Sequence, residues 1–188
     1  MSDQIAFLRG FIAHPEQVGS VWPSSSFLER WLVRAAQAEQ ARSLVELGPG
    51  TGGTTRALLA AMRPEARLLA IELNADFHAR LRARLDDPRV IVQLGSAEEL
   101  PELLQRWRLP APEVIVSGIP FSTMPKASAE RIAAAIAQCL APGGRFVAYQ
   151  VRGHVARFLA PHLGAPRVRW EIVNVPPLRV FRWVKPAA

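Results

Sequence analysis

Glycines at a regular spacing follow the first apolar run of the chain, in the stretch VELGPGTGG (residues 45–53). Glycine lets a backbone turn sharply and approach a ligand, and the free amides at a helix start favour anionic or polar groups. Gly48, Gly50 and Gly53 form a G-x-G-x-x-G pattern, whereas Gly48, Gly50 and Gly52 form G-x-G-x-G. Either pattern favours a turn that holds a nucleotide-containing ligand, and a glycine-rich loop that binds no ligand is the alternative.

The residue before this turn separates the two ligands that fit it, a dinucleotide and S-adenosylmethionine (SAM). Glu46 ends a buried run, where a dinucleotide-binding strand has an apolar residue. A carboxylate there suits the positively charged amino acid end of SAM and is unfavourable beside a pyrophosphate. A chain of 188 residues also leaves little room for a separate substrate domain. We therefore expect SAM, with a dinucleotide as the alternative.

A second acid follows the next apolar run. Glu72 comes 20 residues after Gly52, where an acid accepts hydrogen bonds from both hydroxyls of a ribose. Capping of the following helix is the alternative role for Glu72. The third apolar run ends at GSAE (residues 95–98), and we expect the adenine to lie there.

The fourth apolar run ends in the stretch VSGIPF (residues 116–121). A polar side chain or a backbone carbonyl in this turn would orient the lone pair of an acceptor nitrogen. An aromatic face such as that of Phe121 favours a cationic nitrogen by about 0.5–2 kcal/mol. The alternative is that Phe121 belongs to the core and Ser117 caps the strand. The four histidines and the single cysteine, Cys139, lack metal-ligand spacing, so we expect no metal.

Strands and helices must alternate to position these residues. Apolar runs predict strands, helical patterns lie between them, and Ser128 is expected to open the helix that contains Cys139. Such alternation predicts an α/β fold, a Rossmann-like seven-stranded sheet that is mostly parallel, has a C-terminal antiparallel hairpin, and carries helices on both faces. The predicted strands are 44–47, 68–71, 90–94, 114–116, 145–151, 167–175 and 179–184, and the predicted helices are 3–13, 24–38, 53–62, 75–86, 98–107, 128–140 and 153–163.

Length and charge limit the remaining possibilities. The 188 residues fit a single domain (1–188), in which residues 1–38 form an N-terminal helical lid or membrane-docking segment. No apolar run reaches the ~18 residues of a spanning helix. The single cysteine favours a reducing compartment, so we expect a cytoplasmic protein. The net charge of +7 is compatible with nucleic acid, an anionic membrane or an acidic substrate.

The motifs VELGPGTGG, AIEL, LGSAEEL, SGIPF and LAPGGRFVAYQ together resemble the class I SAM-dependent methyltransferases across residues 44–151. The resemblance implies SAM as cofactor, S-adenosylhomocysteine as product, and catalysis at Ser117, Gly118 and Phe121. Ser96 stands where the family often has an aspartate for the adenine amine, which leaves Glu98 or a backbone carbonyl for that contact. The implied cofactor-binding residues are Glu46, Gly48, Gly50, Gly52, Glu72, Leu73, Ser96, Ala97 and Ser117.

The flanking stretches VGSVWPSSSFL (18–28) and NVPPLRVFRW (174–183) are similar to bacterial phospholipid N-methyltransferases, which methylate phosphatidylethanolamine. This resemblance implies an aminophospholipid substrate and a monomer at the inner, anionic face of the membrane, and it makes nucleic acid an unexpected partner. An rRNA adenine dimethyltransferase and a SAM-binding protein without catalysis are the alternatives. The implied substrate-contacting residues are Trp22, Ser24, Ser25, Ile119, Pro120, Phe121, Tyr149 and Arg152.

Overall fold

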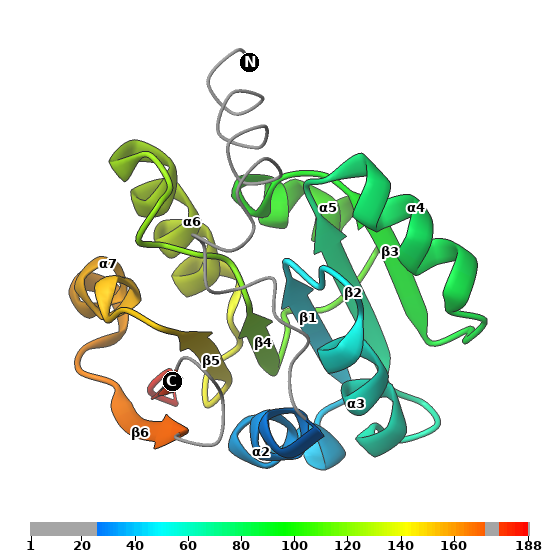
Figure 1. The fold of residues 1–188 in the computed structure, drawn as a ribbon, viewed down its shortest axis with the longest axis horizontal. Coiled ribbons are helices and arrows are strands. Elements are labelled where there is room, and N and C mark those ends of the chain that lie inside the picture. Colours follow the sequence, from blue (N-terminus) through cyan, green and yellow to red (C-terminus); the bar gives the residue numbers. More distant parts are fainter. Residues whose placement is uncertain (1–25, 172–176, 188) are drawn as a thin grey trace.

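The computed structural model describes residues 26–171 and 177–187, and in this part of the chain strands and helices alternate around one twisted sheet (Figure 1). The strands lie in the order β3-β2-β1-β4-β5-β7-β6. Those from β1 to β5 are parallel, whereas β7 is antiparallel to both β5 and β6. The predicted fold is confirmed. The strands are β1 (Ser43–Leu47), β2 (Arg67–Glu72), β3 (Val90–Leu94), β4 (Val114–Ser117), β5 (Arg145–Gln150), β6 (Arg167–Glu171) and β7 (Leu178–Val184).

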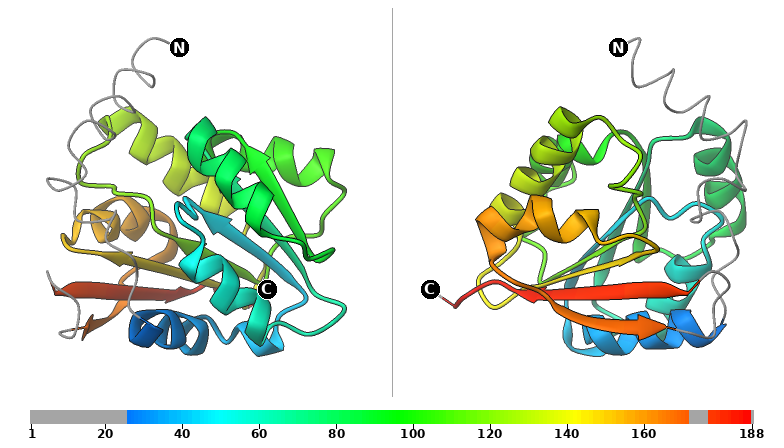
Figure 2. Two further views of the ribbon diagram at one scale, coloured as in Figure 1. Left: turned by 45° about the vertical axis from the view of Figure 1, so that its right-hand side comes forward. Right: turned by 60° about the vertical axis from the view of Figure 1, so that its left-hand side comes forward.

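Helices cover both faces of the sheet (Figure 2). On one face, α2 and α3 pack with the short 3-10 helix η2 against a cluster of buried side chains. On the other face α5, α6 and α7 pack against a second cluster. The helix α4 contacts β2 and β3, and Leu85 at its end packs against the cluster covered by α2 and α3. The helices are α2 (Ser26–Ala36), η2 (Ala38–Gln40), α3 (Gly53–Ala61), α4 (Ala75–Arg84), η3 (Ala97–Glu99), α5 (Leu100–Arg106), α6 (Lys126–Cys139) and α7 (His154–Leu163).

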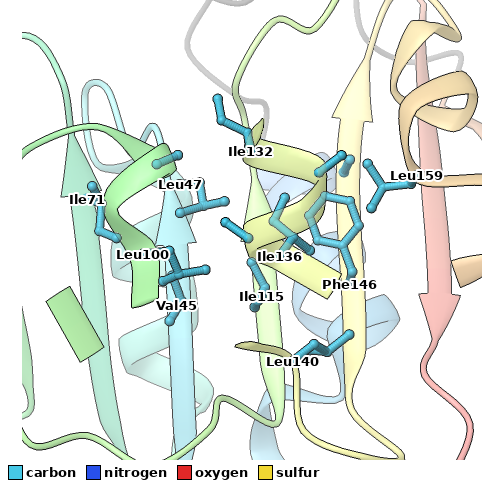
Figure 3. Close-up of a cluster of buried hydrophobic side chains, with 14 of the residues drawn as sticks. Val45, Leu47, Ile71, Leu100, Ile115, Ile132, Ile136, Leu140, Phe146 and Leu159 are labelled. Atoms are coloured by element: carbon cyan, nitrogen blue, oxygen red, sulfur yellow. The ribbon is translucent and has the colours of Figure 1, made fainter. Parts of the chain in front are cut away.

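The larger cluster fills the space between the sheet and the layer formed by α5, α6 and α7 (Figure 3). Val45 and Ile115 point into it from neighbouring parallel strands, and Ile132 and Ile136 point into it from α6. Strands buried on both faces read as continuous apolar runs, which is why VIV of β4 and LVEL of β1 show no alternation. The carboxyl ends of these strands are therefore buried on both faces of the sheet.

The start of α6 differs from the expectation. The helix begins at Lys126, with Pro125 as its N-cap, so the prediction that Ser128 opens it is wrong. Proline fixes its own φ near the helical value and is well suited to the start of a helix. The Ser128 hydroxyl instead accepts a hydrogen bond from the Arg131 guanidinium (3.2 Å) within the helix.

No helix in residues 26–171 and 177–187 is both long enough and apolar enough to cross a membrane.

Candidate functional site

The glycine turn after β1 depends on backbone angles that other residues rarely adopt. Gly48, Gly50 and Gly52 have φ angles of 72°, 54° and 82°. A Cβ on Gly52 would collide with the Leu81 side chain of α4, whereas nothing lies within 4 Å of the corresponding position on Gly50. The turn is thus packed on the α4 side and open at Gly50, where a ligand can approach the backbone.

Glu72 holds this turn from the end of the neighbouring strand. One of its carboxylate oxygens accepts a hydrogen bond from the Gly50 amide (3.0 Å), and the other accepts one from the Asn74 amide (2.9 Å). Burial raises the pKa of Glu72, and the amides of Asn74, Gly50 and Leu73 oppose that rise. A carboxylate has about four lone-pair positions, so acceptor sites remain for two hydroxyls of a ligand.

Glu46 is a buried carboxylate without a hydrogen bond. Its side chain is 1% exposed, and neither oxygen has a hydrogen-bonding partner among the described residues. Burial raises its pKa to about 7, the nearby Thr55 hydroxyl and Arg56 lower it, and Glu72 raises it further. An unpaired buried carboxylate is unfavourable, and a cation beside the glycine turn would relieve that cost.

The turn after β4 lies directly against the glycine turn. Ser117 is fully buried, and its hydroxyl accepts a hydrogen bond from the Ile119 amide (3.3 Å). The Gly118 amide donates to the carbonyl of Leu47 at the end of β1 (3.0 Å). The side chain of Gln150 donates to the carbonyl of Ile119 (2.6 Å) and ties this turn to β5. Ser117 therefore caps the strand, and the rest of the turn has fixed positions.

Tyr149 brings a hydroxyl into the same place from β5. Its oxygen lies 3.5 Å from the Thr54 hydroxyl of α3. A Cβ on Gly118 would lie 2.5 Å from that tyrosine oxygen, so only glycine leaves room for it. Burial, the Glu46 carboxylate and other nearby carboxylates raise the pKa of Tyr149, which therefore stays protonated at neutral pH. The ends of β1, β4 and β5 and the start of α3 thus share one polar cluster.

Phe121 lies on the core side of the β4 turn. It is 2% exposed, belongs to the larger core cluster, and its ring centroid is 6.1 Å from that of Phe158 in α7. This is the arrangement expected if Phe121 is an ordinary core residue. Contact between Phe121 and an acceptor amine stays a prediction, and Tyr149 is the aromatic residue that adjoins Gly118.

The expected adenine side is formed by the ends of β2 and β3. Leu73 is 38% exposed, and Ala97 is 6% exposed within the core cluster. Ser96 forms a capping box: its hydroxyl accepts from the Glu98 amide (3.2 Å), and its own amide donates to the Glu99 carboxylate (2.9 Å). The Glu98 carboxylate is paired with Arg131 of α6 (2.6 Å). The side chains of Ser96 and Glu98 therefore both have partners within the protein already.

The remaining predicted substrate contacts are less closely grouped. Pro120 is half-buried within the β4 turn, and Arg152 is exposed between β5 and α7. Trp22, Ser24 and Ser25 lie outside the described residues.

The sequence interpretation missed several polar side chains that lie around these turns. Thr54 and Thr55 directly follow the glycines, and both are buried at the start of α3. Two hydroxyls on the buried side of a helix start are a readable signal, because buried hydroxyls need partners. Gln150, a polar residue at the end of a buried strand, is a similar signal, because its side-chain amide also needs hydrogen-bonding partners. Asn74 was missed as well: it caps α4 by accepting from the amides of Asp76 and Phe77.

The arrangement suits a ligand with a cation at one end and a diol beside it. Glu46 offers an unpaired buried carboxylate, Gly50 an open backbone, and Glu72 spare acceptor sites. SAM has a positively charged amino acid end and a ribose diol, so these residues fit it. Among the described residues, no group of three or more His, Cys, Asp or Glu side chains could hold a metal ion.

Comparison with known proteins supports this interpretation. The methyltransferase domain family matches residues 44–144. An ornithine lipid N-methyltransferase from Singulisphaera acidiphila is 34% identical over 147 residues, which cover 78% of this chain and 77% of that protein. A ribosomal RNA small subunit methyltransferase A from Synechococcus sp. (strain RCC307) is 32% identical over 108 residues, 57% of this chain but only 38% of that protein.

Among solved structures, an O-methyltransferase from Bacillus cereus in complex with S-adenosylhomocysteine superimposes with a TM-score of 0.70. The alignment covers 98% of this chain and 91% of that one at 14% sequence identity. At that identity the likeness concerns the fold alone.

Proposed function

The chain belongs to the class I SAM-dependent methyltransferases, and on that basis we propose that it N-methylates the amino head group of a membrane lipid. The observation that carries the lipid acceptor is the ornithine lipid N-methyltransferase of Singulisphaera acidiphila, which is similar over 78% of this chain. The proposed acceptors are phosphatidylethanolamine and its methylated forms. An ornithine lipid, which also presents a primary amine, is the second acceptor that this relative favours.

For the cofactor side of the site, we propose one residue for each part of SAM. Glu46 would face the positive amino acid end, and its buried, unpaired carboxylate supports this role. Glu72 would accept from the ribose hydroxyls, and the glycines of the turn would let the backbone approach. Leu73 and Ala97 would flank the adenine. When bound, SAM supplies an electrophilic methyl group.

For the acceptor side, we propose that the turn after β4 orients the amine. The carbonyl of Ile119 is held by Gln150, and Gly118 leaves the space in which the Tyr149 hydroxyl sits. Because that hydroxyl stays protonated, it can donate a hydrogen bond but does not serve as a base at neutral pH. Fixed positions of this kind suit direct transfer, in which alignment of the reactants supplies much of the rate.

Transfer of a labelled methyl group tests the lipid acceptor. The protein would be incubated with labelled SAM and, in parallel, with phosphatidylethanolamine, with an ornithine lipid and with phosphatidylcholine, each dispersed in detergent. Label in the phosphatidylethanolamine fraction is expected, and phosphatidylcholine, which has no free amine, is the matched control. Label in the ornithine lipid alone would assign the second acceptor. Label in none of the lipids would refute the proposal.

A ribosomal RNA acceptor is the competing candidate, favoured by the similarity to ribosomal RNA small subunit methyltransferase A and by the charge of +7. The aligned segment spans 38% of that relative's length. Adding unmodified small-subunit rRNA as an acceptor in the same assay separates the two candidates. Transfer to RNA but not to lipid would make the RNA enzyme the correct assignment.

For the whole chain, we propose a single domain (1–188) in which residues 1–38 form a lid or membrane-docking segment. We also propose cytoplasmic localisation with peripheral attachment to the inner face of the membrane, which suits a lipid acceptor. Fractionation of cells that express the full chain would test this: release of the protein from membranes by high salt is expected, and exclusive recovery in the soluble fraction contradicts it.

A further inference from the structure

Arginines gather on one face of the last three strands. In the antiparallel pair of β6 and β7, Arg167 lies directly opposite Arg182. Arg182 also lies opposite Val147 of β5. Arg145 is two residues before Val147 on that strand, so its side chain lies on the same face as that of Arg182. Arg169, two residues beyond Arg167, extends the row along β6. Side chains alternate along a strand, so all four arginines share the face of the sheet that α2 covers.

These positive charges are not neutralised within the described chain. No ion pair among the described residues includes any of the four arginines. The Nε atoms of Arg145 and Arg182 are buried without a hydrogen-bonding partner, and burial together with Arg145 and Arg167 lowers the pKa of Arg182. Like charges directly opposite one another destabilise a sheet. Repulsion among these guanidinium groups is unfavourable in the protein alone, and anions bound to the arginines would relieve it.

The outer side of α2 continues this basic surface. Phe27 is 47% exposed, and the Arg30 guanidinium lies 6.0 Å from its ring centroid. Arg34 is exposed one turn further along. The Arg169 guanidinium lies 5.9 Å from the Trp31 ring centroid and joins β6 to α2, which lie side by side in both figures (Figures 1 and 2). We call this surface the arginine face; it consists of Phe27, Arg30, Trp31, Arg34, Arg145, Arg167, Arg169 and Arg182.

One end of the arginine face adjoins the candidate site. The Glu29 carboxylate in the first turn of α2 lies against Gly53, at the start of α3. On the sheet, Arg169 is opposite Val180, and Val180 is opposite Tyr149. A surface bound to the arginine face would therefore come close to the turn at which we propose the acceptor amine is held.

We propose that the arginine face docks the protein on an anionic phospholipid bilayer. The inference rests on the proposed function, because a lipid acceptor must reach the site from a membrane. Guanidinium groups bind phosphates in a bidentate manner, and tryptophan favours the boundary between head groups and hydrocarbon. Phe27 and Val184, each 47% exposed beside the arginines, can enter the hydrocarbon boundary but have no comparable partner on a nucleic acid backbone.

Vesicle binding by the full chain tests this proposal. Co-sedimentation would be measured with phosphatidylcholine vesicles that contain phosphatidylglycerol and with pure phosphatidylcholine vesicles. The double variant Arg167→Gln/Arg169→Gln should bind the anionic vesicles about 25-fold more weakly, since each arginine near a membrane contributes roughly five-fold. The matched control, Arg80→Gln/Arg84→Gln, removes the same charge from exposed positions on α4, which contacts the other edge of the sheet. It should bind nearly as well as wild type.

Three outcomes would overturn the proposal: equal loss in both double variants, no loss in either, or no binding of anionic vesicles by wild type. Loss of binding to a structured RNA, with vesicle binding intact, would assign the face to nucleic acid instead. The methylation assay uses lipid dispersed in detergent, so it does not require binding to a bilayer and tests the proposed function separately from the docking. Vesicle binding through this face without methylation of any lipid would refute the function alone, and methylation without vesicle binding would refute the docking alone.

Discussion

At the scale of single residues, Glu46 links the charge of the site to the stability of the protein. Its pKa is raised from 4.5 to about 7 because the carboxylate is buried. The folded protein therefore binds a proton between pH 4.5 and 7 that the unfolded chain does not bind. It follows that the contribution of Glu46 to the free energy of unfolding falls as the pH rises through this window and is constant above it.

We expect the Glu46→Gln variant to show a flatter pH dependence than wild type in the absence of SAM. Above pH 7 it should be more stable by up to about 3 kcal/mol, which is the free energy of a shift of this size. Denaturant unfolding at a series of pH values measures both quantities. The same variant should bind SAM more weakly. Glu72, whose pKa is also raised, is present in both proteins, so a difference between them reports on Glu46 alone. Equal slopes of unfolding free energy against pH would therefore show that Glu46 does not cause the pH dependence.

Gly118 is predicted to be intolerant of any side chain because of Tyr149. Gly118→Ala should destabilise the protein by about 1–3 kcal/mol, the usual effect of overpacking. Adding Tyr149→Phe removes the nearest atom, the hydroxyl oxygen 2.5 Å from the new Cβ, and should restore part of that loss. A double-mutant cycle of unfolding free energies measures the coupling. Strict additivity would show that the two residues do not compete for this space.

Tyr149→Phe by itself separates a role in catalysis from a role in packing. The variant keeps the ring and loses only the hydroxyl that lies near Thr54. We expect methyl transfer to fall by at least about ten-fold, the size of one lost hydrogen bond to a charged group, while the dissociation constant for SAM changes little. Thr54→Ser, which keeps a hydroxyl at the same place, is the control. Unchanged transfer would remove Tyr149 from the acceptor site.

At the scale of elements, the pairing of β6 with β7 places two guanidinium groups opposite each other. Arg167→Glu would convert this contact into an attractive pair with Arg182 and should raise the unfolding free energy by about 0.2–1 kcal/mol. Arg169→Glu is the matched control, because its partner on β7 is Val180. The two variants have equal net charge, so unfolding at low salt compares them directly. An equal gain in both would show that only the net charge matters.

Some of these elements could be predicted from the sequence and others could not. Strands such as Val114–Ser117 were predictable because a strand buried on both faces reads as an unbroken apolar run. The β4 turn was located correctly from Ser117 and Gly118. Its aromatic partner, Tyr149, was expected among the substrate contacts only through the family resemblance, because it reaches the turn through pairing between β4 and β5 rather than through sequence spacing. Phe121, which is near in sequence, points into the core instead.

At the scale of the whole molecule, bound cofactor should stabilise the entire fold. The proposed contacts to SAM come from several strands, and a ligand that binds only the folded state adds about 2.7 kcal/mol at 100 times its dissociation constant. For a chain of this size we expect Tm to rise by about 5–10 °C. Scanning calorimetry with S-adenosylhomocysteine measures the shift. Glu72→Ala should abolish it, and a full shift in that variant would contradict the ribose assignment.

The outermost position of β6 has a consequence beyond ligands. A strand at the edge of a sheet offers unpaired backbone groups to the edge of another copy, which is a common route to aggregation. Arg167 and Arg169 lie on this strand, so two copies that met edge to edge would bring like charges together. The arginines whose mutual repulsion disfavours the folded sheet thus also oppose edge-to-edge pairing of two copies. Replacing them to gain stability would leave an edge strand that is prone to aggregation.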